Sequence, residues 1–144
     1  MRVYIAGKLG TENEIETLEM INKLCKDLGI ETFLPHRDVG IAKGINDVEM
    51  IFKGDIIEGF KNCNMVIASL DGIHIGSGTA WELGYAYAKG IPIIGLKTDE
   101  SIEDALDYLS PIIVASTKIV KSYDELKEEL RELISLCKRN ISDN

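Results

Sequence analysis

Two glycine-containing segments carry the residue types that could bind an anion. They follow two apolar runs and consist of Gly7-Lys8 and of the stretch Asp71-Gly72-Ile73-His74-Ile75-Gly76-Ser77-Gly78-Thr79. Glycine in front of a helix lets backbone amides approach a phosphate, and the helix dipole adds to the attraction. Such glycines are also common for steric reasons, the spacing is not GxGxxG, and the Walker lysine is missing. The pattern therefore indicates either an anion-binding turn or a purely steric one.

Glu82 follows the second segment and has two interpretations. The spacing from Thr79 to Glu82 is that of a capping box, in which the glutamate bonds back to the amide of the cap residue. Alternatively, a carboxylate near the start of a helix, flanked by Trp81 and Tyr85 at the carboxyl edge of a sheet, faces a ligand and acts as a nucleophile. Spacing alone favours the cap.

The other reactive side chains form no metal-binding or disulfide pattern. Two lone histidines without nearby carboxylate ligands do not indicate a metal site. His36, Arg37 and Asp38 either reach a base or phosphate or form a surface salt bridge. Three cysteines, far apart and odd in number, are expected to be buried thiols: Cys25, Cys63 and Cys137.

Length and charge limit the class of protein. The 144 residues, 45% of them hydrophobic, suffice for one domain with a substantial core. The net charge of −8 repels a nucleic-acid backbone, although a few amides can still hold a small anionic metabolite. The chain starts directly with a strand-like run, and no apolar run approaches the ~18 residues that span a membrane. We therefore expect a cytoplasmic protein that binds a small molecule.

Short apolar runs alternate with amphipathic segments, which is typical of parallel strands covered by helices on both faces. The pattern predicts a single-domain α/β fold with a five-stranded parallel sheet, Rossmann-like or flavodoxin-like. In such sheets ligands bind beyond the carboxyl ends of the strands, where the two glycine-containing segments fall. The predicted strands are Arg2 to Ala6, Glu31 to Leu34, Met65 to Ser69, Pro92 to Leu96 and Ile112 to Ala115.

Apolar residues at helical spacing predict five helices. The first ends at Gly29, and the second covers about residues 50–63, where Gly54 and Gly59 mark a break or a turn. Two others cover about 79–89 and 101–109, and the last begins at the capping-box pair Ser122 and Glu125 and carries apolar residues from Leu126 to Cys137. The irregular stretch 35–46 is a candidate binding loop, and residues 138–144 form a polar tail.

Four segments carry a more specific pattern, whose most distinctive part is the block GTAWELGYA. They are Val3-Tyr4-Ile5-Ala6-Gly7, residues 65–72, residues 78–86 and Lys89-Gly90-Ile91-Pro92. Together they resemble the nucleoside 2-deoxyribosyltransferase family over about residues 2–97. The resemblance moves the interpretation of Glu82 from helix cap to catalytic residue and predicts one domain of this type over residues 1–137.

The resemblance implies an enzyme that breaks the N-glycosidic bond of a 2-deoxynucleoside or its 5-monophosphate, with no metal or cofactor. Glu82 would attack the anomeric carbon, expel the base and hold deoxyribose as a glycosyl ester until another base or water arrives. The missing 2-hydroxyl helps, because an electron-withdrawing group beside the anomeric carbon destabilises the oxocarbenium-like transition state. Transfer and hydrolysis are not separable by motif.

The family also implies two catalytic partners for Glu82. A tyrosine of the first strand lies beside the nucleophile and is matched by Tyr4, for which a simple core role is the alternative. An aspartate before the third strand assists protonation of the departing base, and Asp55 matches it with a displacement of one position. Because of that displacement, Glu58 or a solvated Asp55 remain alternatives.

Position 76 departs from the transferases, which carry there an aspartate that holds the sugar 5-hydroxyl. A carboxylate would repel a 5-phosphate, whereas Gly76 and Ser77 would accept one, as in the related 2-deoxynucleoside 5-phosphate N-hydrolases. The arginine of those hydrolases has no counterpart, since Gly10 stands in its place. The expected substrate-binding residues are Gly7, Lys8, Asp71, Gly72, Gly76, Ser77 and Gly78, with Lys8 and the last three as a phosphate cradle.

The family completes its site with a polar residue from a neighbouring subunit, near the fourth helix. Asp107 or Ser110 stands there, which implies a homodimer or a dimer-based oligomer. A rival hypothesis from another functional class is a non-catalytic nucleotide-binding module of flavodoxin-like fold, in which Glu82 only caps its helix.

Overall fold

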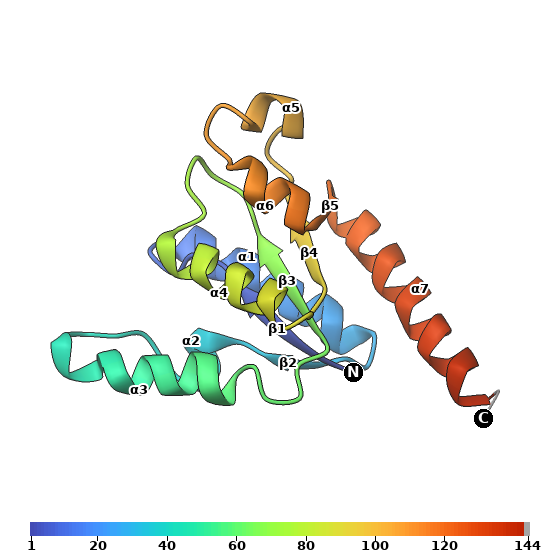
Figure 1. Ribbon diagram of the computed structural model, residues 1–144, viewed down its shortest axis with the longest axis horizontal. Coiled ribbons are helices and arrows are strands. Elements are labelled where there is room, and N and C mark those ends of the chain that lie inside the picture. Colours follow the sequence, from blue (N-terminus) through green and yellow to red (C-terminus); the bar gives the residue numbers. More distant parts are fainter. Residues whose placement is uncertain (143–144) are drawn as a thin grey trace.

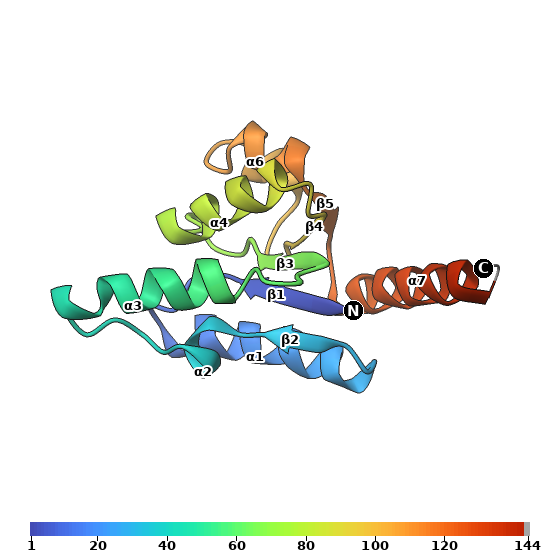
Figure 2. The same ribbon diagram turned by 60° about the horizontal axis from the view of Figure 1, so that its bottom comes forward.

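The computed structural model of the chain describes residues 1–142, which form a parallel sheet between two layers of helices (Figures 1 and 2). The strand order is β2-β1-β3-β4-β5, which is the flavodoxin-like order, and it confirms the predicted α/β class. After β1 the chain continues to β2 on one side, and after β3 it continues to β4 on the other side. The connections that follow β1 and β3 therefore lie on opposite faces of the sheet. The strands are β1 (Arg2–Ala6), β2 (Glu31–Phe33), β3 (Met65–Ser69), β4 (Ile93–Leu96) and β5 (Lys118–Val120).

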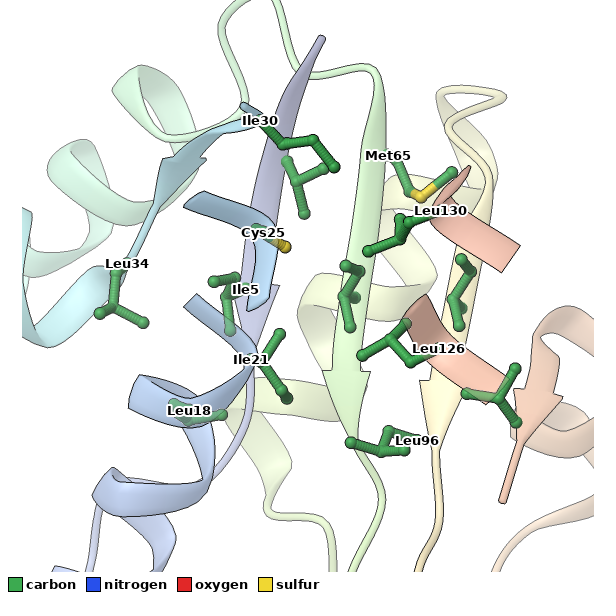
Figure 3. Packing of buried hydrophobic residues seen from close by; sticks show 14 residues of the cluster. Ile5, Leu18, Ile21, Cys25, Ile30, Leu34, Met65, Leu96, Leu126 and Leu130 are labelled. Carbon is green, nitrogen blue, oxygen red and sulfur yellow. The ribbon is translucent and has the colours of Figure 1, made fainter. Parts of the chain in front are cut away.

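One face of the sheet is covered by α1 (Glu12–Asp27) and α7 (Tyr123–Ser142), and Figure 3 shows the core between them and the strands. The helices contribute residues at helical spacing, Leu18 and Ile21 from α1 and Leu126 and Leu130 from α7, all fully buried. The capping box at the start of α1 uses Thr11. This layer holds the sheet together but lies on the opposite face from Glu82.

The other face is covered by the helical segments around α4 (Ser77–Ala88), as Figure 2 shows. Side chains of a strand alternate between faces, so β1 sends Val3 and Ile5 to the first core and Tyr4 and Ala6 to the second. The second core includes the fully buried Tyr4, and it also takes Leu83 from α4. Two short helices, α5 (Ile102–Ala105) and α6 (Pro111–Ser116), complete this layer.

The segment before β3 is a short helix α3 (Val48–Phe52) that continues into a π-helix, η2 (Lys53–Glu58). Gly54 and Gly59 allow close packing here. A Cβ at Gly54 would lie 2.6 Å from Val39 Cγ1, and a Cβ at Gly59 would lie 2.8 Å from the Tyr4 ring. The Gly59 N–H donates to Gly54 O, five residues earlier, at 2.9 Å, which is the hydrogen bond of a π-helical turn. π-Helical turns are rare and frequently occur at functional sites.

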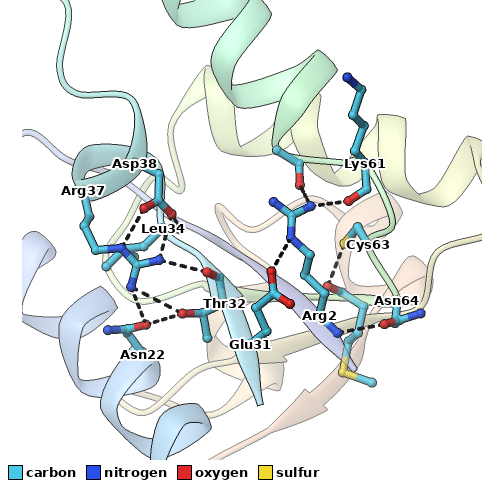
Figure 4. Close-up of polar contacts among 12 residues, drawn as sticks. Arg2, Asn22, Glu31, Thr32, Leu34, Arg37, Asp38, Lys61, Cys63 and Asn64 are labelled. Atoms are coloured by element: carbon cyan, nitrogen blue, oxygen red, sulfur yellow. Dashed lines mark hydrogen bonds and ion pairs between the residues drawn. The ribbon is translucent and has the colours of Figure 1, made fainter. Parts of the chain in front are cut away.

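The edge of the sheet at β2 is tied down by two arginines (Figure 4). Arg37 belongs to α2 (Pro35–Asp38), donates to Thr32 O at 2.8 Å and pairs with Asp38 at 2.8 Å. Arg2 pairs with Glu31 at 3.3 Å and donates to the carbonyls of residues 59 and 61. The segment 36–38 therefore makes structural salt bridges, one of its two predicted roles.

The predicted fifth strand at 112–115 is wrong, because these residues form α6 and the strand follows at Lys118–Val120. Ser110 caps α6 by accepting the Ile112 N–H at 3.2 Å, and Pro111 occupies the first helical position, where its missing donor costs nothing. The helix predicted at 101–109 is confined to Ile102–Ala105 and ends in a turn. The long stretch 35–46, predicted to be irregular, contains α2 and the start of the 3-10 helix η1 (Ile45–Asp47).

The serine half of the capping box predicted at the start of α7 is confirmed, since Ser122 Oγ accepts the Glu125 N–H at 3.1 Å, while the Glu125 carboxylate accepts the Lys121 N–H at 2.8 Å. All three cysteines are free, but only Cys25 is buried, and Cys137 lies exposed on α7, contrary to expectation. The helix α7 continues through residues 138–142, which are exposed, and residues 143–144 of the predicted tail lie outside the described part of the chain. None of the helices within residues 1–142 has the length and apolar character to cross a membrane.

Candidate active site

A pocket of about 490 Å³ lies between α3 and η2 on one side and the first half of α4 on the other. Both helical segments present one face to it, since the lining positions recur at helical spacing. Ten residues line the pocket: Ala42, Val48, Ile51, Phe52, Asp55, Ile56, Ser77, Gly78, Trp81 and Glu82. Glu82 and Asp55, both predicted to be catalytic, thus face the same space.

Glu82 is held by a tyrosine from the middle of the sheet. Helix α4 begins at Ser77 with Gly76 as its N-cap, so the predicted capping box from Thr79 to Glu82 does not form. The Tyr4 hydroxyl donates to Glu82 Oε1 at 3.0 Å instead. The Tyr4 ring stacks on Phe60, with ring centroids 4.2 Å apart, so its hydroxyl has little freedom to move.

The environment of Glu82 is unfavourable for a charge. Burial, opposed by the Tyr4 hydrogen bond and reinforced by the negative charge of Asp55, raises the pKa of its carboxyl to about 7. Burial, followed by the charge of Glu82, also raises the pKa of the Tyr4 hydroxyl, which keeps that hydroxyl a donor. The result is a carboxyl that ionises near neutral pH and, once ionised, is poorly solvated, as a nucleophile requires.

Asp55 lies on η2, and its Oδ1 is a buried atom with no hydrogen-bond partner within the described residues. Burial raises the pKa of this carboxyl to about 6, so a protonated form is available near neutral pH. The alternative candidate Glu58 is exposed and pairs with Lys61 at 2.9 Å, outside the pocket. Of the two carboxylates, Asp55 is the one that the structure brings to Glu82.

Three residues of the predicted phosphate cradle, Gly76, Ser77 and Gly78, lie at the start of α4, whereas Lys8 touches Gly76 with its aliphatic chain but lines a separate pocket. Gly76 has a φ of 87°, a conformation that favours glycine, and a Cβ there would lie 3.0 Å from Lys8 Cγ. An aspartate, the residue that the family resemblance implies at this position, would therefore be both strained and crowded here. Ser77 and Gly78 line the Glu82 pocket, while the Lys8 ammonium pairs with Glu14 at 3.1 Å.

The remaining predicted binding residues lie outside the Glu82 pocket. Asp71 accepts from the Thr98 N–H and hydroxyl, both at 2.6 Å, and fixes one loop to another. Asp71 and Gly72 line a separate polar pocket beside α1. A Cβ at Gly7 would lie 2.6 Å from Leu18 Cδ2, so this glycine permits the close approach of β1 and α1. Asp107 is exposed in the turn after α5.

Two features of this region are not foreseen from the sequence. Lys97 is 1% exposed, and its ammonium donates to Leu70 O at 3.1 Å and pairs with Asp99 at 2.7 Å, which anchors the loop that leads to α4. No spacing marks this lysine as buried, because the Leu70 carbonyl that it binds is 27 residues away in sequence. The second feature is the pocket wall formed by Val48 and Phe52. The sequence pattern that could have predicted it is the helical spacing, which places these two apolar residues on the same helix face as Asp55.

Comparison with solved structures shows extensive similarity. A conserved protein from Enterococcus faecalis V583 is 27% identical, with a TM-score of 0.71 over 92% of this chain and 98% of that one. A 2-deoxyribosyltransferase from Bacillus psychrosaccharolyticus is 21% identical, with a TM-score of 0.72 over 88% and 90% of the two chains. The CMP N-glycosidase BcmB of Clostridium botulinum is also 21% identical, with a TM-score of 0.59 over 91% and 99%. The last two likenesses concern the fold.

A search among functionally curated proteins gives no match. The model of the family described as nucleoside 2-deoxyribosyltransferase, however, matches residues 3–118. This range contains Tyr4, Asp55 and Glu82, the strands β2, β3 and β4, β1 without Arg2, and the first residue of β5. The chain therefore belongs to the nucleoside 2-deoxyribosyltransferase family.

Proposed function

We propose that the protein cleaves the N-glycosidic bond of 2-deoxynucleosides or their 5-monophosphates through a covalent ester on Glu82. The observation that best supports this is the placement of the Glu82 carboxylate, which lines a pocket and accepts the Tyr4 hydroxyl at 3.0 Å. Burying a carboxylate costs free energy, and no cation within the described residues pairs with Glu82 to offset that cost. A reactive role accounts for this arrangement better than helix capping.

In the first step, an oxygen of ionised Glu82 attacks the anomeric carbon and forms a C–O bond while the C–N bond to the base breaks. The electron pair of the C–N bond leaves with the base, and protonated Asp55 neutralises it by giving up its proton. Tyr4 orients the Glu82 carboxylate throughout. In the second step water or another base attacks the ester carbon, its proton passes to Asp55, and Glu82 is released as a carboxylate.

A 2-deoxynucleoside 5-monophosphate N-hydrolase is the second candidate, and the start of α4 favours it. No side chain caps the start of α4, because its N-cap residue is Gly76. The first amides of the helix can therefore bind an anion, and the helix dipole strengthens the attraction. Lys8 lies against Gly76. Because Glu14 already pairs with Lys8, we expect the amides of Ser77 and Gly78 to make the larger contribution to phosphate binding.

The test is to incubate the protein with dCMP, dGMP, deoxyadenosine and the ribose counterparts, with and without free adenine, and to follow base release or exchange by chromatography. Glu82→Ala should abolish turnover, because it removes the covalent route, while Glu58→Ala, which removes an exposed carboxylate of the same region, should not. Base exchange on unphosphorylated nucleosides would contradict the phosphate hypothesis. Full activity of Glu82→Ala would contradict the role of Glu82 as nucleophile. No turnover of any substrate would contradict an enzymatic function and favour the non-catalytic nucleotide-binding module.

We also expect a homodimer or a dimer-based oligomer. Asp107 does not line the Glu82 pocket of its own chain, so it can serve a site only across a subunit contact. The exposed apolar side chains of Leu106 and Ile112 flank this region, and a second copy would cover them. Light scattering coupled to size exclusion tests this expectation, and a monomer at all concentrations would contradict it.

A further inference from the structure

We propose that Trp81 and Phe52 form the platform on which the base is recognised, by stacking on its faces rather than by hydrogen bonds to its edge. This inference rests on the proposed function, since it assigns the base-binding part of the same pocket. It implies that the enzyme accepts bases with different hydrogen-bonding patterns.

The two rings come from opposite walls of the pocket, Trp81 from α4 and Phe52 from α3. Their centroids are 6.0 Å apart and the ring planes are at 77°, so they form a corner. On the helix, Tyr85 stacks on the Trp81 ring at 5.5 Å and 12°, which fixes the orientation of the indole. Trp81 is nevertheless 52% exposed and Phe52 49% exposed. Large aromatic surfaces left open at a pocket indicate a ligand that covers them.

The pocket is divided into a polar and an apolar part. Apart from the indole N–H of Trp81, its side chains that can ionise or hydrogen bond are Asp55, Ser77 and Glu82, and the proposed reaction and the sugar use these three. Trp81 precedes Glu82 directly, and Phe52 lies about one helical turn before Asp55, so the corner begins beside the reacting groups. The base is bonded to the carbon that Glu82 attacks and therefore falls on this corner.

The apolar part offers a base a single side-chain donor, the Trp81 indole N–H, and no side-chain acceptor. Its lining residues are Ala42, Val48, Ile51, Phe52, Ile56 and Trp81. Stacking on an aromatic ring tolerates every base, because all bases have a π-face. Larger bases cover more of the two rings, so purines should bind more tightly than pyrimidines.

Fluorescence provides a direct test, because Trp81 is the only tryptophan of the chain. The full chain carrying Glu82→Gln, which retains an oxygen to accept from Tyr4, is titrated with adenine, cytosine and 2-deoxyribose 5-phosphate. We expect saturable quenching by both free bases, stronger for adenine, and little change with the sugar phosphate. Quenching by the sugar phosphate equal to that by the bases, or no response to any base, would overturn the proposal.

Steady-state kinetics of the Glu82-containing enzyme supplies the second readout. Trp81→Ala and Phe52→Ala should each raise KM roughly 5- to 150-fold with a smaller change in kcat, since stacking holds the base in the ground state and transition state alike. Trp81→Phe should restore most of the loss. The matched control is Met50→Ala, which removes a 52% exposed apolar side chain of α3 outside the pocket and should leave KM unchanged. An unchanged KM in Trp81→Ala would refute the platform.

The two experiments separate this inference from the proposed function. Turnover of deoxynucleotides without base quenching, and with a normal KM in Trp81→Ala, would refute the platform and leave the reaction in place. Saturable quenching by free bases in a protein that turns over no substrate would support the platform and refute the reaction. A single base accepted at least a thousandfold better than all others, in wild-type and Trp81→Ala alike, would also refute recognition by stacking.

Discussion

Replacing Tyr4 by phenylalanine removes one hydrogen bond and leaves the surrounding packing in place. The hydroxyl donates to Glu82 Oε1 at 3.0 Å and thereby lowers the pKa of this carboxyl, which burial and the charge of Asp55 nevertheless hold at about 7. The ring itself stacks on Phe60 at 4.2 Å and on Phe33 at 5.3 Å, and phenylalanine keeps both contacts. The perturbation therefore acts on the protonation of Glu82.

The size of the effect follows from the strength of the lost bond. A hydrogen bond to a charged group contributes about 1.5–3 kcal/mol, and one pKa unit corresponds to about 1.4 kcal/mol, so the pKa of Glu82 should rise by roughly 1–2 units. At pH 7 the ionised fraction of Glu82 then falls from about one half to between about 1 and 10%, which lowers kcat/KM roughly 5- to 50-fold.

The assay is the pH dependence of kcat/KM in an Asp55→Asn background, because the pKa of Asp55 is raised to about 6 and its titration would overlap that of Glu82. With Tyr4 present, kcat/KM should rise with pH through a midpoint near that of Glu82. With Tyr4→Phe the midpoint should move upward and activity should recover at higher pH. Tyr108→Phe, which removes a hydroxyl from a partly buried ring of the same core, should not shift it. An unshifted midpoint in Tyr4→Phe would refute the electrostatic role of Tyr4.

Three further predictions follow from the same region. Asp55→Asn should slow base release in single turnovers by roughly 10²- to 10⁴-fold, whereas Glu58→Gln should leave it near the wild-type rate; equal losses would remove Asp55 as the acid. The pKa of Glu82 rises on folding from 4.5 to about 7, so the folded state holds its proton longer and wild-type stability falls as pH rises through this range. Glu82→Gln should therefore gain up to about 3 kcal/mol over wild type in urea unfolding at about pH 8 compared with about pH 4, and a pH-independent difference would contradict this. Lys97→Met should lower the free energy of unfolding by about 1.5–3 kcal/mol, because it leaves the buried Leu70 carbonyl without its donor; a loss under about 0.5 kcal/mol would show that the loop is held by other contacts.

The fold was largely predictable because strand and helix periodicities alternate clearly along the chain. The wrong prediction at 112–115 shows the limit of that signal, since a short run of apolar residues looks the same in a buried strand and in a short helix. Ser110 and Pro111, a cap residue followed by a residue that favours the first helical turn, were the local signal for α6.

The site was predictable in its residues but not in its geometry. Spacing placed Glu82 in a capping box, and only the contact with Tyr4, 78 residues away, shows where its carboxylate points. The approach of Asp55 depends on a π-helical turn and on Gly59, whose absent side chain lets that turn pack on the Tyr4 ring. Such long-range packing leaves no periodic trace in the sequence.

The covalent intermediate on Glu82 can be tested most directly by the mass of the enzyme after acid quench during turnover. The expected result is an adduct of one 2-deoxyribosyl group, or its 5-phosphate, on the peptide that contains Glu82, and none in Glu82→Gln. An adduct on a different residue, or base release by Glu82→Gln at the wild-type rate in the same quenched samples, would contradict the mechanism.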